Sequence, residues 1–258
     1  MLSKARAKEI AALHQKKFRK ELGLFLVEGE KMVDELLHSR LRTKQLVATV
    51  AWLNNNPLAG DTGAELTEAG PGDLARISTL ITPNQVVAVV EIPAAKALPP
   101  DPGKELGLVL DGIQDPGNLG TIIRTADWFG IPHIFCSEDS VELYNPKVVQ
   151  ASMGGIFRVS VHYLDLVNWL PGYKKLSPYP VYGTFTDGTS IYSEEMTGNG
   201  LVILGNESRG IATALQAFVD RKLAIPPFGQ SGAESLNVSV AAAIICSEFR
   251  RRTIRSGN

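Results

Sequence analysis

Cysteine is scarce in this chain. The 258 residues include only Cys136 and Cys246, and neither belongs to a CxxC pair. Both lie in apolar segments, so we expect buried, reduced thiols and a cytoplasmic protein. Long apolar runs are also absent, because none reaches the roughly 18 residues that a membrane span needs. Charged residues interrupt the N-terminus where a signal peptide would be continuously apolar.

The signatures of common nucleotide and metal sites are missing as well. The sequence contains no G-x-G-x-x-G, so a Rossmann nucleotide site has no support, and no G-x-x-x-x-G-K-[ST] phosphate loop. The histidines are scattered without the spacing of metal ligands, so we expect no zinc site. They are His14, His38, His133 and His162.

Basic residues gather at both ends of the chain, although the formal net charge is only −1. The first 20 residues have basic side chains at positions 4, 6, 8, 16, 17, 19 and 20 against one acid, Glu9. The second cluster consists of Arg250, Arg251, Arg252 and Arg255. Such clusters suit an RNA phosphate backbone, and the alternative is a solvated helix face with a frayed tail. The predicted RNA contacts are Lys16, Lys17, Arg19 and Lys20.

A proline-rich segment divides the chain. Residues 91–105 contain four prolines and a glycine, which extend the chain and break helices and sheet ladders. We therefore predict a first domain over residues 1–92, a linker over 93–105 and a second domain over 106–258.

The first domain mixes helical and extended patterns, which fits a small αβ sandwich. We predict a basic helix over residues 4–20 and an amphipathic helix over 29–40, with Met32, Val33, Leu36 and Leu37 on one face. The predicted strands cover residues 22–29, 45–53 and 85–92.

The second domain alternates apolar strands with helices. The predicted strands cover residues 106–113, 131–138, 157–164, 180–186, 200–206 and 222–227. The predicted helices cover residues 119–129, 146–152, 211–218 and 236–252. Apolar strands separated by helices indicate an α/β fold with a parallel sheet covered on both faces.

Three blocks of the second domain place polar residues between an apolar run and a helical pattern. They are residues 115–130 (DPGNLGTIIRTADWFG), 201–211 (LVILGNESRGI) and 225–244 (IPPFGQSGAESLNVSVAAAI). This layout puts polar side chains and bare backbone amides at the carboxyl ends of strands, where open α/β sheets bind ligands.

The polar residues of these blocks also have purely structural interpretations. Arg124 interrupts an apolar helix surface, so it could form a salt bridge or extend its charged end to solvent. Glu207 could be a favourable charge at a helix N-terminus. Ser235 could be an N-cap with Asn237 in the first turn, and Asn118 or a neighbour could cap the helix of the first block.

In order, spacing and polar residues, the three blocks resemble the signature motifs of the SpoU or TrmH class of RNA ribose 2′-O-methyltransferases, within the SPOUT superfamily. More loosely, residues 18–37 (FRKELGLFLVEGEKMVDELL) are similar to the substrate-binding domain of that family, which has the fold of small RNA-binding ribosomal proteins. The resemblance implies a deep trefoil knot in the C-terminal α/β domain. The sequence IPPFG at 225–229 differs slightly from the IPM-type sequence that is more usual in the third motif of the family.

The resemblance implies methyl transfer from S-adenosylmethionine to a ribose 2′-hydroxyl, without a metal. It makes Arg124 the catalytic arginine, with Asn118, Glu207, Ser235 and Asn237 as further active-site residues. A guanidinium ordinarily keeps its proton, so Arg124 either sits in surroundings that remove it or stabilises the developing alkoxide electrostatically. The implied cofactor contacts are Gly183, Thr184, Leu204, Gly205, Asn206, Ile225, Pro227 and Leu236.

Ribosomal RNA is the expected substrate, because small tRNA-specific members of the family often lack a separate N-terminal domain. The alternatives are a tRNA 2′-O-methyltransferase and a non-catalytic RNA-binding assembly factor. The resemblance also implies a homodimer, in which Arg124 acts on cofactor held by the partner subunit. We expect the small-residue face of the last helix to form part of the dimer surface.

Overall fold

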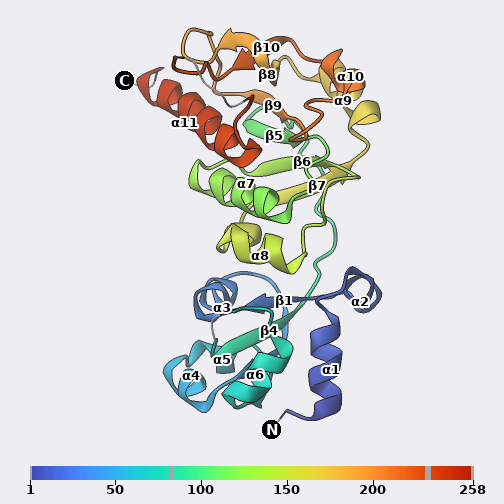
Figure 1. The fold of residues 1–258 in the computed structure, drawn as a ribbon, viewed down its shortest axis with the longest axis vertical. Helices are drawn as coiled ribbons and strands as arrows, with labels where there is room; N and C mark the ends of the chain where they lie inside the picture. The colour runs from blue at the N-terminus through green and yellow to red at the C-terminus, as the bar shows by residue number, and fades with distance from the viewer. Residues whose placement is uncertain (1, 82–83, 230–233, 257–258) are drawn as a thin grey trace. The chain divides into compact units, whose positions relative to one another are not determined.

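The computed structural model describes residues 2–81, 84–229 and 234–256. The chain forms two compact units (Figure 1): Met1–Ala94 with Leu143–Phe157, and Ala95–Glu142 with Arg158–Asn258. The sequence places all of residues 106–258 in one domain, whereas residues 143–157 group with the first unit. One reason is a contact between aromatic rings, because the centroids of Tyr144 and Phe25 lie 4.5 Å apart.

A four-stranded sheet forms the first unit, in the order β1-β4-β2-β3. Its strands are β1 (Leu24–Glu28), β2 (Thr43–Ala48), β3 (Glu65–Glu68) and β4 (Val86–Glu91). The central strand β4 runs antiparallel to β1 and β2, and β3 runs parallel to β2. The strand predicted over 45–53 ends at Ala48, because Thr49 accepts a hydrogen bond from the Trp52 amide and caps a helix there.

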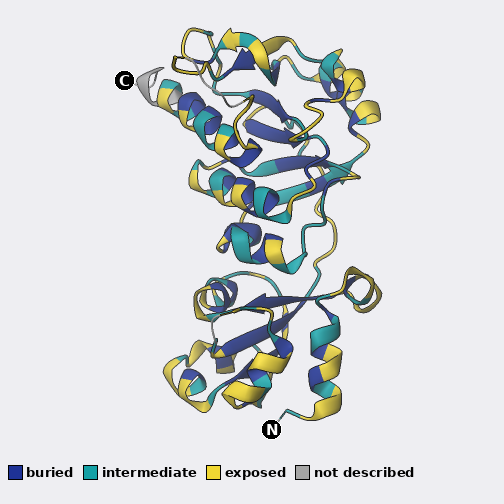
Figure 2. Cartoon of the chain, in the orientation of Figure 1, coloured by how far each residue is buried: buried dark blue, intermediate teal, exposed yellow. Residues whose placement is uncertain are grey.

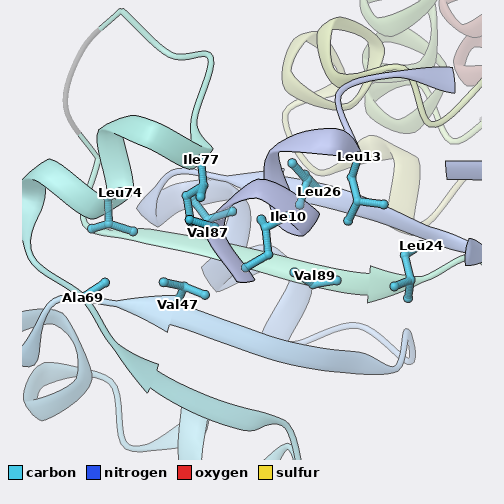
Figure 3. Packing of buried hydrophobic residues seen from close by; sticks show 11 residues of the cluster. Ile10, Leu13, Leu24, Leu26, Val47, Ala69, Leu74, Ile77, Val87 and Val89 are labelled. Carbon is cyan, nitrogen blue, oxygen red and sulfur yellow. The ribbon is translucent and has the colours of Figure 1, made fainter. Parts of the chain in front are cut away.

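Helices cover both faces of this sheet. They are α1 (Lys4–Ala12), α2 (Lys16–Leu22), α3 (Glu30–Leu37), α4 (Val50–Asn55), α5 (Leu58–Asp61), α6 (Pro71–Ile77) and α8 (Pro146–Ser152), with a 3-10 turn over Gly155–Phe157. Figure 3 shows side chains of α1 and α6, among them Ile10 and Ile77, packed on Val87 and Val89 of β4. Met32, Val33 and Leu36 of α3 are buried as the sequence predicts.

The basic helix predicted over residues 4–20 is two helices. The chain turns between α1 and α2, and Gln15 has extended dihedral angles (φ −96°, ψ 132°). The Arg19 side chain is only 3% exposed and donates a hydrogen bond from Nη1 to the carbonyl of Leu13, at 2.7 Å. This bond satisfies a carbonyl at the end of α1 where the helical hydrogen bonds stop.

The second unit contains a six-stranded sheet, ordered β10-β8-β9-β5-β6-β7, in which every pairing is parallel. Its strands are β5 (Leu106–Leu110), β6 (His133–Ser137), β7 (Ser160–Leu164), β8 (Val181–Ser190), β9 (Gly200–Leu204) and β10 (Arg221–Ala224). The predicted parallel α/β sheet is therefore confirmed. The central strands β5 and β9 are buried along their whole length, as Figure 2 shows.

Helices cover both faces of this sheet as well. They are α7 (Pro116–Trp128), α9 (Leu166–Leu176), α10 (Thr213–Gln216) and α11 (Val238–Ser256). Figure 1 shows α7 and α11 packed side by side on one face and α9 with α10 on the other. The path from β10 to α11 includes residues 230–233, which lie outside the described residues, so the knot stays a prediction. No helix in the described part of the chain is long and apolar enough to cross a membrane.

Candidate active site at the carboxyl ends of the second sheet

The first and second blocks meet where β5 and β9 end. The two strands are parallel neighbours, so their carboxyl ends open at the same edge of the sheet. After β9 the chain makes a tight turn in which Asn206 and Gly210 exchange backbone hydrogen bonds of 3.0 and 2.9 Å. A Cβ at Gly205 would lie 2.2 Å from the Gly210 carbonyl carbon, so this turn requires glycine at position 205.

Asn118 joins all three blocks. Its side-chain amide donates from Nδ2 to Glu207 Oε1 at 2.7 Å, and its Oδ1 accepts from Asn237 Nδ2 at 3.0 Å. The three residues come from the start of α7, the turn after β9 and the residue before α11. We call this group the polar triad. It brings together positions 118, 207 and 237, which the sequence connects only through the resemblance.

One residue near the triad and one member of the triad cap the two helices α7 and α11. Asp115 Oδ1 accepts from the Asn118 amide at 2.8 Å, so α7 begins at Pro116, earlier than predicted. Asn237 Oδ1 accepts from the Ser239 and Val240 amides at 2.9 and 3.4 Å. Asn237 therefore caps α11, and the interpretation of Ser235 as the cap is wrong. Ser235 lies exposed in the loop just before that cap.

Arg124 does not interrupt the packing surface of α7. The buried residues of this helix are Leu119, Gly120, Ile122, Ile123 and Ala126, whereas Arg124 is exposed. Among the described residues its guanidinium has no hydrogen-bond or ion-pair partner, so of the two structural alternatives the salt bridge is not formed there. Arg124 follows Asn118 by six residues, about 9 Å along the helix axis. Its charge is thus available to a ligand or to another chain.

Thr184 begins an irregular part of β8. The ladder between β8 and β9 runs only from Val181 to Gly183. On the other side the register with β10 jumps, because Lys222 pairs with Gly183 and the next residue, Leu223, pairs with Thr189. Residues 184–188 consequently leave the ladder beside the carboxyl end of β9.

The other predicted cofactor positions follow the same sheet edge. Leu204 is the buried last residue of β9, and Gly205 and Asn206 follow it directly. Ile225 comes after the last residue of β10 and is half-buried, whereas Pro227 and Leu236 are exposed in the loop that leads to α11. These positions supply apolar side chains and irregular backbone together, which is the make-up of a small-molecule site.

Comparison with known proteins assigns both units. Residues 105–247 match the SpoU rRNA Methylase family, and residues 4–88 match the MRM3-like substrate binding domain. The chain belongs to the SpoU rRNA Methylase family. The predicted family and its N-terminal substrate-binding domain are therefore confirmed.

Relatives of this SpoU family member align with it along nearly its whole length. The 23S rRNA (guanosine(2553)-2′-O)-methyltransferase RlmP of Bacillus subtilis is 32% identical over 246 residues, which cover 95% of this chain and 96% of that protein. A putative RNA methyltransferase of the TrmH family from Porphyromonas gingivalis has a similar structure, with a TM-score of 0.86, 41% identity and coverage of 98% and 99%. The SpoU methyltransferase AviRb from Streptomyces viridochromogenes, in complex with AdoMet, has a TM-score of 0.83, 25% identity and the same coverage.

The basic clusters of this SpoU family member are used in different ways. Lys16, Lys17 and Lys20 are exposed on α2, whereas Arg19 of the same helix is buried and its side chain bonds to the end of α1. At the other end of the chain, Arg250 donates to the carbonyls of Phe129 and Gly130, both at 2.7 Å. Arg19 and Arg250 therefore stabilise the fold, and the three lysines remain as candidates for phosphate contacts.

Asp111, which the sequence analysis did not select, supports the same edge of the sheet. Its Oδ2 accepts from the Ala212 amide at 2.6 Å, and burial raises the pKa of its carboxyl group. The sequence feature that could have identified Asp111 is an acidic residue directly after a buried strand, one position beyond β5. Where the chain is described, no group of three His, Cys, Asp or Glu side chains could hold a metal ion.

Proposed function

We propose that the protein transfers a methyl group from S-adenosylmethionine to a ribose 2′-hydroxyl in ribosomal RNA. The observation that carries the proposal is the polar triad, since it unites the three blocks at the start of α7, the helix on which Arg124 is exposed. Family membership and the relatives' names support the chemistry. The closely similar RlmP is named as a 23S rRNA 2′-O-methyltransferase.

The sheet edge around β8, β9 and β10 fits the cofactor. S-adenosylmethionine supplies an electrophilic methyl group on a sulfonium. Leu204, Ile225 and Leu236 would contact its apolar parts, and the backbone at Gly205 and residues 184–188 would bind its polar edges. Gly183, Thr184, Asn206 and Pro227 complete the proposed cofactor set.

Arg124 would act electrostatically. Its guanidinium is exposed and forms no ion pair with a carboxylate among the described residues, so its charge can face the ribose oxygen as the proton leaves. Glu207, Ser235 and Asn237 would position the ribose, with Asn118 holding Glu207 and Asn237 in register.

The ribosomal substrate is favoured over tRNA by the extent of the alignment. RlmP covers 95% of this chain, so the relationship includes the N-terminal unit that matches a substrate binding domain. Lys16, Lys17 and Lys20 would contact RNA phosphates there, which position RNA without specifying its sequence.

We further propose a cytoplasmic homodimer. Both cysteines are buried free thiols, which fits a reducing compartment. Apolar side chains lie exposed on and beside the paired helices α7 and α11, where a second copy could cover them: Trp128 (84%), Leu236 (47%) and Val240 (46%).

The function is tested in a deletion strain by primer-extension mapping of 2′-O-methyl groups on ribosomal RNA and tRNA. We expect one ribosomal site to be lost and to return with the wild-type gene but not with Arg124→Ala. In calorimetric titration the purified Arg124→Ala variant should still bind S-adenosylmethionine. An unchanged ribosomal map would refute the ribosomal substrate, and absence of cofactor binding by the wild type would favour an assembly factor.

A further inference from the structure

We propose that residues 137–141 (SEDSV), which comprise the last residue of β6 and the loop after it, position the active site, with Ser137 as the central residue; we call this segment the β6 loop. The inference rests on the proposed function. This loop lies outside the three blocks, yet it contacts the segment that leads from β5 into α7. Ser137 is a positioning residue, because it acts through that segment and not on the substrate.

The backbone of Gly112 is held on both sides of its α-carbon. Its amide donates to Ser137 Oγ at 2.8 Å, and its carbonyl accepts from Asn206 Nδ2 at 2.7 Å. Gly112 has a φ of +68°, and a Cβ there would lie 3.4 Å from Asp139 Oδ2 and 3.6 Å from an Arg209 nitrogen. The β6 loop and the turn after β9 therefore hold the backbone of this one residue between them.

The next two residues are held by the same loop. The Ile113 amide donates to Ser140 Oγ at 3.2 Å, and the Ile113 carbonyl accepts from the Val141 amide at 2.8 Å. The Gln114 side chain donates to the Asp139 carbonyl. Residue 115, the cap of α7, follows immediately. Because residues 112–114 are fixed, the start of α7 and the amide of Asn118 are fixed with them.

Ser137 links residues 112–114 to the turn after β9. Its hydroxyl donates to Asp139 Oδ1 at 2.6 Å while accepting from Gly112, and donation to a carboxylate strengthens it as an acceptor. Asp139 lies 4.0 Å from the guanidinium of Arg209, two residues after Glu207. Both side chains of that ion pair are exposed, so it contributes little. The hydrogen bonds of the Ser137 hydroxyl therefore hold the segment more strongly than the ion pair does. Ser137 thus couples the loop before Asn118 to the turn that carries Glu207.

The test compares Ser137→Ala with Ser137→Thr, which keeps the hydroxyl, and with Ser160→Ala as a control. Ser160 accepts a hydrogen bond from Lys96 at the opposite end of the sheet. We expect Ser137→Ala to lower kcat for 2′-O-methylation by about ten- to a hundredfold, because small displacements of reacting groups cost that much. The KM for S-adenosylmethionine and the thermal midpoint should stay near wild type, and Ser137→Thr should restore kcat.

Hydrogen exchange at the Gly112 and Ile113 amides supplies a readout that needs no activity. Faster exchange at Gly112 in Ser137→Ala supports the positioning role of Ser137, whereas wild-type exchange or wild-type kcat overturns it. If Ser137→Ala does not fold, the exposed Asp139→Ala decides, and an unchanged kcat there counts against the proposal. A wild-type protein that methylates no RNA would refute the proposed function, while the exchange data would still test whether Ser137 holds the Gly112 amide.

Discussion

Asn118 uses both ends of one neutral side chain, and this makes it hard to replace. It donates to a carboxylate and accepts from an amide at the same time. Asparagine and glutamine are the two residues whose side chain ends in an uncharged planar amide with both a donor and an acceptor. Aspartate has the same shape but loses the donor, and it would place a second carboxylate against Glu207.

We therefore expect Asn118→Asp to lose most activity at neutral pH, because the two carboxylates repel each other and separate the turn from α7. Activity should partly return as the pH falls and one carboxyl takes up a proton. The measurement is kcat for 2′-O-methylation across the pH range in which the protein stays folded. Adding Glu207→Gln to Asn118→Asp should restore a donor and acceptor pair, and a double variant no better than the single one would contradict this account.

At the residue scale the sequence identified the right positions but not their surroundings. Residues 118, 207 and 237 are brought into contact as the three blocks suggest, but Arg124 is exposed rather than inserted in the core. An arginine between apolar residues is ambiguous, because a rotation of the helix by one residue decides between core and solvent. The cap of α11 was misplaced by two residues, since both serine and asparagine are good caps.

Among the elements, α11 is fixed by a buried acid. The Glu248 side chain is 6% exposed and accepts hydrogen bonds from Arg251 and Arg252. These bonds, first that from Arg251, lower the pKa of Glu248 from 4.5 to about 2. Arg252 also donates to the carbonyls of Ile191 and Tyr192, which ties α11 to the segment after β8.

The stability of the protein should therefore depend on the charge of Glu248. A lowered pKa in the folded state gives stabilisation that is complete above pH 4.5 and is lost as the pH falls towards about 2. We expect Glu248→Gln to lower the free energy of unfolding at pH 7 and to flatten its decline between these values. Urea unfolding at several pH values measures this, with the exposed Glu138→Gln as a control. Parallel curves for wild type and Glu248→Gln would show that Glu248 contributes nothing.

The missed helix α9 shows what limits prediction of elements. It contains Pro171 and Gly172, which normally end a helix, and the sequence analysis left residues 166–176 without a helix. The structure keeps it helical because Asp165 caps its start and Leu166, Leu170 and Tyr173 are buried against the sheet. Tertiary packing outweighs local preference here, whereas the central strands β5 and β9 were predicted well because their burial is continuous.

At the scale of the whole molecule, the exposed Arg124 favours a site shared between two copies. We expect a 1:1 mixture of Arg124→Ala with a cofactor-site variant, Thr184→Arg, to regain activity when subunits exchange. One site of each mixed dimer would then combine an intact arginine with an intact cofactor pocket. Methylation rates before and after mixing are the measurement, with sedimentation to establish the dimer and calorimetry to verify that Thr184→Arg binds no cofactor.

Two results would contradict this prediction, and they lead to different conclusions. A fully active monomer would refute the homodimer, and a dimer whose mixture stays inactive would place Arg124 and the cofactor in the same subunit. Long-range organisation of this kind is beyond the sequence, which also gave no reason for residues 143–157 to join the first unit. Phe25 and Tyr144 lie more than a hundred residues apart in the sequence, so their contact leaves no local sequence pattern.

Asn237 also sets the order in which the protein can mature during synthesis. It lies 119 residues after Asn118, yet it closes the triad with that residue, and Arg250 caps the far end of α7 from a still later position. The first unit's N-terminal strands and helices can fold while translation continues. The catalytic edge cannot close until the final helix has left the ribosome, so a nascent chain stalled before residue 237 would be folded in part and inactive.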